Sequence, residues 1–503
     1  MRSTRLTVVA LLLLLPAVAC QAQEAEDEGD TMQTAGEAEA MPVTAASDMA
    51  VTHYEAGQRA LDMGRVDEAR AEFEKAIAAD PDFAMGYWGL ANSANSLESF
   101  RENVEQAEEY AGRASEAEQL RIEVMRAGFE DDVEAQKAAA DRLVEVAPNS
   151  PRAWMALAAV QSDMGDEAAA RESLERAIEL DPDFAPAHMA LGNSYLFTEP
   201  IDLDAARSQM ERVVELEPDE AITHDLLGDA YRAQGMLEEA AAEYGQTAEL
   251  DEDSGNGYQQ RAHVHSFLGN YEQARADYDR AIEIESGTNI AASFGVYRAL
   301  VSVHEGNLEA AVDELESLVD EIDGMDIPGP RGPKIFALNS AIQIALHGGM
   351  LDRAEALLER RNALLDENVA VAGTEAAERN ATVAKAVMRG RLAAHRGNYD
   401  AALEAAEEAR AALEAGNDPD RYEPVHQLIG FVHLQQENHD EAITHYEQSN
   451  PDDIYAVYHH ALALEGAGRT AEANELFAKV ADWRFNSPGL ALVRADASEK
   501  VAE

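Results

Sequence analysis

The sequence contains a single cysteine among its 503 residues, so an intrachain disulfide and a metal site built from cysteines alone are both excluded. Basic residues are also scarce: 39 Lys and Arg stand against 97 Asp and Glu, and the formal net charge is −58. Nucleic-acid binding by phosphate neutralisation needs a basic surface, so this class of function is excluded. Aromatic residues make up only 6% of the chain. The apolar residues are mostly Ala, Leu and Val, which favours packed helices over sheets.

The first twenty residues read MRSTRLTVVALLLLLPAVAC. Two arginines precede an apolar run that is too short to span a bilayer as a mature helix, a pattern typical of a secretory signal. Cys20 follows Ala17-Val18-Ala19, which resembles the lipobox of bacterial lipoproteins. The resemblance implies a signal peptide over 1–19, acylation of Cys20 (palmitate included) and attachment to a lipid bilayer. An ordinary cleaved signal with an incidental cysteine is the alternative.

The residue after the cysteine helps to predict the membrane to which the protein is sorted. In Gram-negative lipoproteins an Asp at this place favours the inner membrane, so Gln21 implies the outer membrane, with the protein facing the periplasm. Residues 20–48 are acidic and lack hydrophobic periodicity. We therefore expect them to form a flexible tether between the bilayer and a folded region.

A short turn motif recurs along the rest of the chain: a Gly or polar pair, then a polar stretch that ends in Ala. Copies occupy 63–69, 164–170, 234–240, 268–274, 305–311, 348–354 and 396–402, with weaker copies at 436–442 and 467–473 and a longer variant at 198–206. Pro148 and Pro182 lie 34 residues apart, as do Ala240 and Ala274. A fixed period of this length indicates a repeat protein.

The residues around the motif strengthen this interpretation. The stretch that begins at Trp154 continues with Leu157, Ala158, Gly165, Ala170 and Pro182, and later stretches repeat the pattern with His188 and His224 in place of the Trp. This pattern resembles the tetratricopeptide repeat. About ten copies would make an all-α, right-handed superhelical solenoid of antiparallel helix pairs. The resemblance also implies a concave surface that holds proteins or peptides.

Two departures from the pattern suggest how the chain is divided. Residues 99–147 have a helical composition but lack the turn motif, and 324–333 is rich in Gly and Pro with no period, as in a hinge loop. We therefore expect an N-terminal array over 49–323, which includes the divergent helices, and a C-terminal array over 334–503.

The fifth and ninth places of each copy should face the concave surface. They hold an aromatic residue, several amides and two carboxylates: Trp88, Asn92, Met189, Asn193, Asp225, Asp229, Gln259 and His263. Such groups suit an aromatic anchor and hydrogen bonds to a partner's backbone, although solvated helix positions would look the same. None of these places holds a basic residue, so a clamp for a terminal carboxylate is not expected. An acidic groove should prefer basic or neutral segments.

No motif for nucleophilic, phosphate-binding or zinc chemistry is present, so we expect no enzyme activity, no catalytic residue and no cofactor. Six of the 14 histidines lie within 426–460 and raise the possibility of a metal site. His53, His188, His224 and His426, however, share the slot of the repeat that usually holds Trp. This recurrence favours packing over metal binding, and we expect no metal site.

The sequence therefore predicts a membrane-anchored scaffold of the cell envelope that binds proteins. A subunit of a machine for outer-membrane protein assembly, pilus biogenesis or polysaccharide export is the alternative. The acidic, lysine-poor surface, with six Lys, can equally reflect adaptation to salt or simple solubility.

Overall fold

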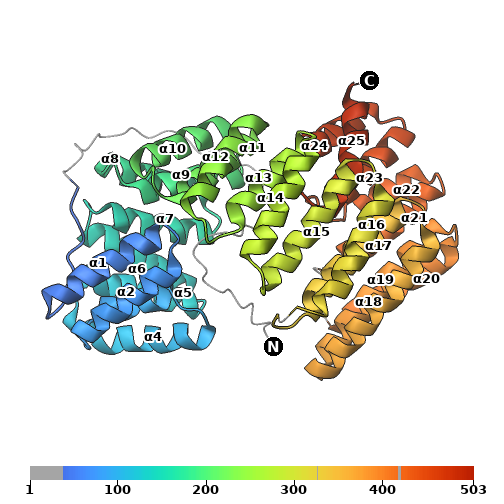
Figure 1. Cartoon of the computed structure of the whole chain (residues 1–503). Helices are drawn as coiled ribbons and strands as arrows, with labels where there is room; N and C mark the ends of the chain where they lie inside the picture. Colours follow the sequence, from blue (N-terminus) through green and yellow to red (C-terminus); the bar gives the residue numbers. More distant parts are fainter. Residues whose placement is uncertain (1–37, 326, 417–420, 503) are drawn as a thin grey trace. The chain divides into compact units, whose positions relative to one another are not determined.

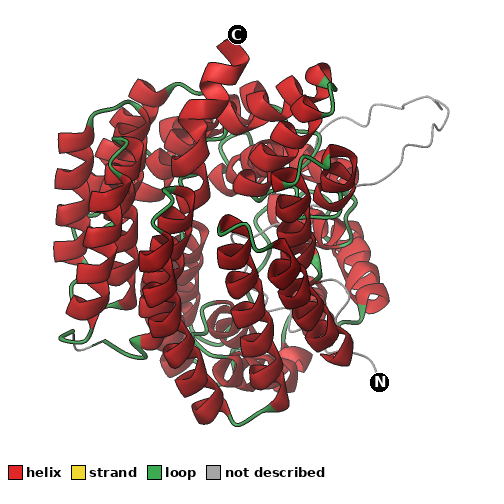
Figure 2. Cartoon of the chain, turned by 90° about the vertical axis from the view of Figure 1, so that its right-hand side faces the viewer, coloured by secondary structure: helices red, strands yellow, loops and turns green. Residues whose placement is uncertain are grey.

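The computed structural model describes residues 38–325, 327–416 and 421–502. Over these residues it consists of helices joined by short turns and contains no strand (Figures 1 and 2). The prediction of an all-α solenoid of helix pairs is confirmed. The contacts divide the chain into two compact units, unit 1 up to Ala230 and unit 2 from Tyr231 onward.

Unit 1 consists of successive helix pairs, with a short 3-10 turn between α4 and α5. Its elements are α1 (Asp48–Asp62), α2 (Val66–Ala79), α3 (Ala84–Asn92), α4 (Leu97–Tyr110), η1 (Ala111–Arg113), α5 (Glu116–Phe129), α6 (Val133–Val146), α7 (Pro151–Asp163), α8 (Glu167–Leu180), α9 (Ala185–Phe197) and α10 (Leu203–Leu216). The next helix, α11 (Ala221–Ala233), contains the boundary between the units.

Unit 2 continues the pairing to the end of the chain. Its helices are α12 (Leu237–Leu250), α13 (Asn256–Phe267), α14 (Tyr271–Ile284), α15 (Asn289–His304), α16 (Leu308–Ile322), α17 (Arg331–His347), α18 (Leu351–Ala372), α19 (Glu375–His395), α20 (Tyr399–Gly416), α21 (Glu423–Gln435), α22 (His439–Tyr446), α23 (Ile454–Gly466), α24 (Thr470–Asp482) and α25 (Pro488–Ala502). None of the helices in the described part of the chain is both long enough and apolar enough to span a membrane.

The turn motif marks the place where the two helices of a pair meet. Its glycine adopts a left-handed conformation, as at Gly165 (φ 78°) and Gly306 (φ 81°), which a side chain would disfavour. Asp131 (φ 58°) takes this conformation between α5 and α6, and Glu437 (φ 60°) does so between α21 and α22. The divergent residues 99–147 therefore contain a helix pair whose turn lacks the usual glycine.

The alanine that ends the motif is buried in the contact between neighbouring helices. Each copy places it early in the second helix of the pair: Ala69, Ala170, Ala240, Ala274 and Ala311 are at most 2% exposed. A methyl group at this place allows close approach, and larger side chains such as Tyr244 and Tyr278 fill the space around it.

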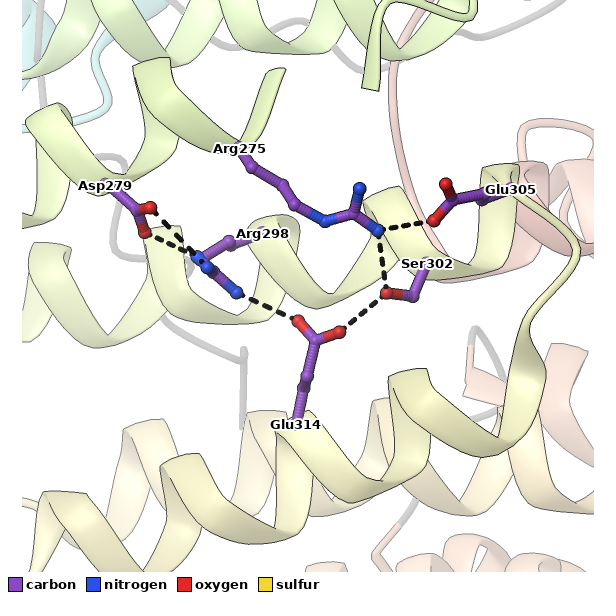
Figure 3. Close-up of polar contacts among 6 residues, drawn as sticks. All are labelled: Arg275, Asp279, Arg298, Ser302, Glu305 and Glu314. Atoms are coloured by element: carbon purple, nitrogen blue, oxygen red, sulfur yellow. Dashed lines mark hydrogen bonds and ion pairs between the residues drawn. The ribbon is translucent and has the colours of Figure 1, made fainter. Parts of the chain in front are cut away.

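An arginine that follows this alanine ties the pair to the next one. Arg70 donates to the Ser93 carbonyl (2.6 Å), and Arg171 donates to the Ser194 hydroxyl (2.8 Å). In unit 2 the Arg275 guanidinium reaches the Ser302 hydroxyl at 3.2 Å (Figure 3).

The contacts in Figure 3 continue beyond this arginine. The Ser302 hydroxyl donates to Glu314 (2.6 Å), and Glu314 accepts from Arg298 (3.0 Å), which also contacts Asp279. These polar contacts join α14, α15 and α16 and hold them in register.

Two segments differ from their expected roles. Residues 38–46, the last part of the predicted tether, pack along unit 1: the Thr44 amide donates to Glu118 (2.7 Å) and the Ala46 amide to Asp80 (2.6 Å). Residues 20–37 lie outside the described residues. The Gly/Pro segment 324–333 is not where the units divide, because α15, α16 and α17 on its two sides share one hydrophobic core.

Candidate functional site

The odd-numbered helices form the inner row of each unit. Contacts between alternate helices join α1 to α3 and α3 to α5 in unit 1, and α13, α15 and α17 in unit 2. The even-numbered helices lie outside this row. Side chains on the inner row are the ones that a partner in the curve of the solenoid would meet, so the candidate surfaces lie here.

In unit 1 the inner row carries a stacked arginine. The Arg121 guanidinium lies over the Trp88 ring, 3.9 Å from its centroid. It donates to the Tyr54 hydroxyl (3.0 Å) and to the Gln58 amide oxygen (3.4 Å). All four groups are on α1, α3 and α5. The predicted aromatic anchor Trp88 therefore lies against a cation that the sequence analysis did not foresee.

An ion pair between Asp62 and Arg152 links α1 of this row to α7. Gln58 donates to Asp62 (3.0 Å), and Arg152 at the start of α7 also donates to Asp62 (3.0 Å) and contacts it with its second nitrogen. Burial disfavours the charge of Arg152, but its bonds to Asp62 outweigh this effect and raise its pKa. The two side chains link helices that are 90 residues apart in the sequence.

The other predicted groove residues of unit 1 are less accessible than expected. Asn92 is bonded to its own helix through the Trp88 carbonyl (2.9 Å), and Met189 is only 5% exposed. The Asn193 side-chain oxygen is buried without a hydrogen-bond partner. Asp225 and Asp229 lie one turn apart on α11 and are half-buried. The structure brings Trp88 and Asn92 together on α3, whereas Met189 and Asn193 lie on α9.

In unit 2 the two predicted residues lie on α13. The Gln259 amide nitrogen is 3.4 Å from His263 Nε2. The imidazole of His263 is covered by the rings of Tyr297 (4.9 Å between centroids) and Tyr278 (5.8 Å). Burial, with smaller effects from Arg232 and His304, lowers the pKa of His263 to about 3. It is therefore a neutral, packed residue.

A further set of inner-row residues was missed from the sequence. The position directly before the turn motif is the last residue of the first helix, and it holds an aromatic ring in four successive first helices: Phe267, His304, His347 and His395. The rings of the first two are in contact, with centroids 5.6 Å apart. Recurrence at one place beside the motif was the signal available in the sequence.

His347 and His395 belong to an aromatic cluster inside unit 2. The ring of Phe431 lies between those of His395 (4.8 Å) and His459 (5.4 Å), and Tyr455 contacts both His459 (4.5 Å) and His347 (5.9 Å). Burial lowers the pKa of His459 to about 4, and the neighbouring His347 and His395 act in the same direction. The inner row of unit 2 is thus apolar and largely filled.

Two of the four histidines assigned to the Trp slot share a contact with Trp154, whereas His53 contacts Glu72 and His426 contacts His445. Trp154, His188 and His224 each donate a ring N–H to a proline carbonyl six residues earlier, at 2.9 to 3.0 Å. His188 and His224 are 6% and 8% exposed, in keeping with packing.

Of the histidine-rich segment, His426 and His445 approach each other, with their Nδ1 atoms 3.0 Å apart. Over the described residues, no group of three or more His, Cys, Asp or Glu side chains is placed to hold a metal ion.

A cavity of about 340 Å³ lies on unit 1 between the ends of α4 and α5. Its lining includes the carboxylates of Glu108, Glu116 and Glu123 together with Leu120 and Ile122. Burial, together with nearby carboxylates, raises the pKa of Glu108 despite the attraction of Arg126. The polar lining consists of these three carboxylates and the amide of Gln119.

No curated protein sequence matches the chain. Among solved structures, the MamA 41-end structure from Desulfovibrio magneticus RS-1 is 19% identical with a TM-score of 0.31, and the match covers 34% of this chain and 96% of that one.

Two further structures match to a similar extent. YrrB, described as a TPR protein with an unusual peptide-binding site, is 19% identical with a TM-score of 0.30, covering 36% and 91% of the two chains. A thermophilic TPR protein from Thermus thermophilus is 22% identical with a TM-score of 0.28, covering 34% and 91%.

Family models described as tetratricopeptide repeat match five segments, in both units. The matched residues are 54–118, 151–184, 202–257, 256–288 and 382–449. These segments carry most of the turn motifs described above, while the copies at 305–311, 348–354 and 467–473 lie outside them. The chain is therefore a member of the tetratricopeptide repeat family.

Proposed function

We propose that this protein is a lipid-anchored scaffold of the cell envelope that binds protein partners through the inner rows of its repeats. The observation that supports binding most directly is the stacking of helix pairs. A pair cannot bury its apolar face alone, and stacking creates an extended surface on one side. In unit 1 this surface carries Trp88 and Arg121, the residue types that most often anchor protein interfaces.

A capture experiment tests the binding role. The full chain would be purified from detergent-solubilised envelopes, alongside a Trp88→Ala variant that removes the stacked ring. Arg142→Ala, which removes only exposed ion pairs of α6 with Glu116 and Glu145, is the matched control. We expect a stoichiometric protein that the control retains and the Trp88 variant loses. A partner retained equally by all three would contradict a binding surface at Trp88.

The same experiment separates the two forms of the proposal. A single membrane-embedded partner at constant stoichiometry would favour a subunit of an envelope assembly or export machine. Several clients captured in variable amounts would favour a general adaptor. We propose no catalytic role and no cofactor, because the tetratricopeptide repeat is generally a binding module.

The proposed anchor rests on the sequence around Cys20, which lies outside the described residues. Two or more acyl chains would hold the protein stably at a bilayer. Cys20→Ser should release the protein into the soluble fraction after cell disruption, and metabolic labelling with a fatty acid should disappear with it. Retention of the variant in carbonate-washed membranes would contradict lipid anchoring. Separation of inner and outer membranes on a density gradient would test the proposed outer-membrane address.

A further inference from the structure

Residues 483–502 contact more of unit 2 than a helix that only closed the stack would. Residues 483–487 are non-helical and lead from α24 into α25. As the next first helix, α25 packs against α23 and α24. It also contacts α15 and α17, which lie far earlier in the chain but in the same unit. The segment therefore lies across the inner row of unit 2.

Specific side chains make this second set of contacts. The His304 Nε2–H donates to the Asn486 side-chain oxygen (3.0 Å), a contact between residues 182 positions apart. The Arg494 guanidinium lies over the Phe267 ring, 4.6 Å from its centroid. Phe267 and His304 are two of the four residues that precede the turn motif. The segment thus contacts the inner row of unit 2, the surface on which stacked helix pairs expose a binding face.

The burial of α25 shows that it is enclosed. Leu490, Ala491, Leu492 and Val493 are consecutive and each is at most 8% exposed. Four successive residues of a helix point to all sides of its axis, so this turn of α25 has no solvent-facing side. A helix that only covered the end of the stack would leave one face in water.

The polar side of this contact is incompletely satisfied. Arg484 Nε and Arg494 Nε are buried and have no hydrogen-bond partner. Burial, with the nearby Arg484 charge, lowers the pKa of Arg494 to about 10. Permanent cores satisfy nearly all of their buried polar groups, whereas interfaces between separable parts are more polar. Residues 483–487 before α25 are non-helical, so α25 can move without unwinding α24.

We propose that residues 483–502 are a resident and displaceable occupant of the inner surface of unit 2. An external partner helix competes with this segment, and its chemistry is that of the segment: an apolar first turn preceded by an amide and an aromatic residue. The competition lowers the apparent affinity of the partner by the fraction of molecules in which the surface is free. The external partner rests on the proposed scaffold function, but the displacement of the segment does not.

Hydrogen exchange on the full chain tests the displacement. We expect amides of α25 to exchange at least roughly tenfold faster than those of α15 and α17, because the segment opens while the rest of unit 2 stays folded. Asn486→Ala removes the bond to His304 and should speed this exchange roughly tenfold more. Ser498→Ala, at an exposed position of α25, is the control and should leave the exchange unchanged. Exchange of α25 in one slow event with α15 and α17 in both variants would overturn the proposal.

A peptide added in trans provides the second test. A labelled peptide of residues 483–502 should bind saturably to a chain that ends at Asp482, and more weakly to the full chain. The same peptide with Asn486→Ala should bind the shortened chain several-fold more weakly. No binding to a shortened chain that keeps its helical content and cooperative unfolding would overturn the proposal, and if that chain does not fold, the exchange experiment decides. Partner capture through Trp88 is independent of these outcomes, so the two proposals can fail separately.

Discussion

Single side chains in this protein act mostly by tying one helix pair to the next. Trp154, His188 and His224 hold the loop before their helix through a proline carbonyl. This contact explains why His can replace Trp at 188 and 224, because both kinds of ring present an N–H at the same place. The ion pair between Asp62 and Arg152 acts over a longer range, because it joins α1 to α7. The contribution of such a pair depends on its burial.

Arg152→Ala should lower the free energy of unfolding of unit 1 by about 2 to 3 kcal/mol. The substitution removes the cation bonded to the Asp62 carboxylate, whose side chain is 12% exposed, and leaves it the bond from Gln58. Chemical denaturation followed by the fluorescence of Trp88 and Trp154 would measure the change. Arg142→Ala, whose partners are exposed, should leave the unfolding curve unchanged. Equal effects of the two substitutions would show that burial of the first pair has no influence.

At the scale of helices, the spacing of a pair is set by residues without a bulky side chain. The Phe73 ring of α2 is fully buried between Gly57 of α1 and Gly89 of α3. Gly192 of α9 faces Met210 of α10 in the corresponding contact, where a Cβ atom would lie 2.7 Å from the terminal methyl of the methionine. The two contacts differ in how far the facing side chain can yield.

Gly89→Ala should therefore be more harmful than Gly192→Ala. Alanine is favoured over glycine in a helix by about 1 kcal/mol, which works in favour of both substitutions. At position 89 the new methyl group would overlap the rigid Phe73 ring, and we expect a net loss of about 2 kcal/mol. At position 192 the end of Met210 can rotate away, so the net change should be small. Thermal and denaturant unfolding of both variants would check this order, and equal losses would contradict it.

The helix pairs were the part of the fold most open to prediction from sequence. The glycine with positive φ and the buried alanine are local requirements, so each leaves a mark in the sequence at a fixed place. The pair α5 and α6 escaped because Asp131 takes the glycine conformation, for which the sequence pattern has no marker. The groove residues were harder to predict: His263 is covered by Tyr278 and Tyr297, which come from later helices.

At the scale of the molecule, the two units differ in the character of their inner rows. Unit 1 carries charged and polar groups around Trp88, whereas unit 2 carries buried rings and is occupied by residues 483–502. The contact of α25 with α15 and α17 depends on the accumulated curvature of many pairs, which no local pattern encodes. The histidines whose pKa values are lowered all lie in unit 2: His263, His265, His304, His347, His395, His426, His445, His459 and His460.

These histidines should make unit 2 sensitive to mild acid. The pKa of His459 is about 4 in the folded chain, below the value of about 6.5 expected when unfolded, so between these two values only the unfolded chain binds the proton. Stability is therefore complete above pH 6.5 and is lost as the pH falls toward 4. When the pH falls from 7.5 to 5.5, the free energy of unfolding should fall for both chains. The fall should be about 1.4 kcal/mol smaller for His459→Phe than for the unmodified chain. Phe431→Leu, which alters the same cluster without removing a titratable group, should keep the original pH dependence. A His459 variant with unchanged pH dependence in denaturant titrations would show that this imidazole is not held neutral by the fold.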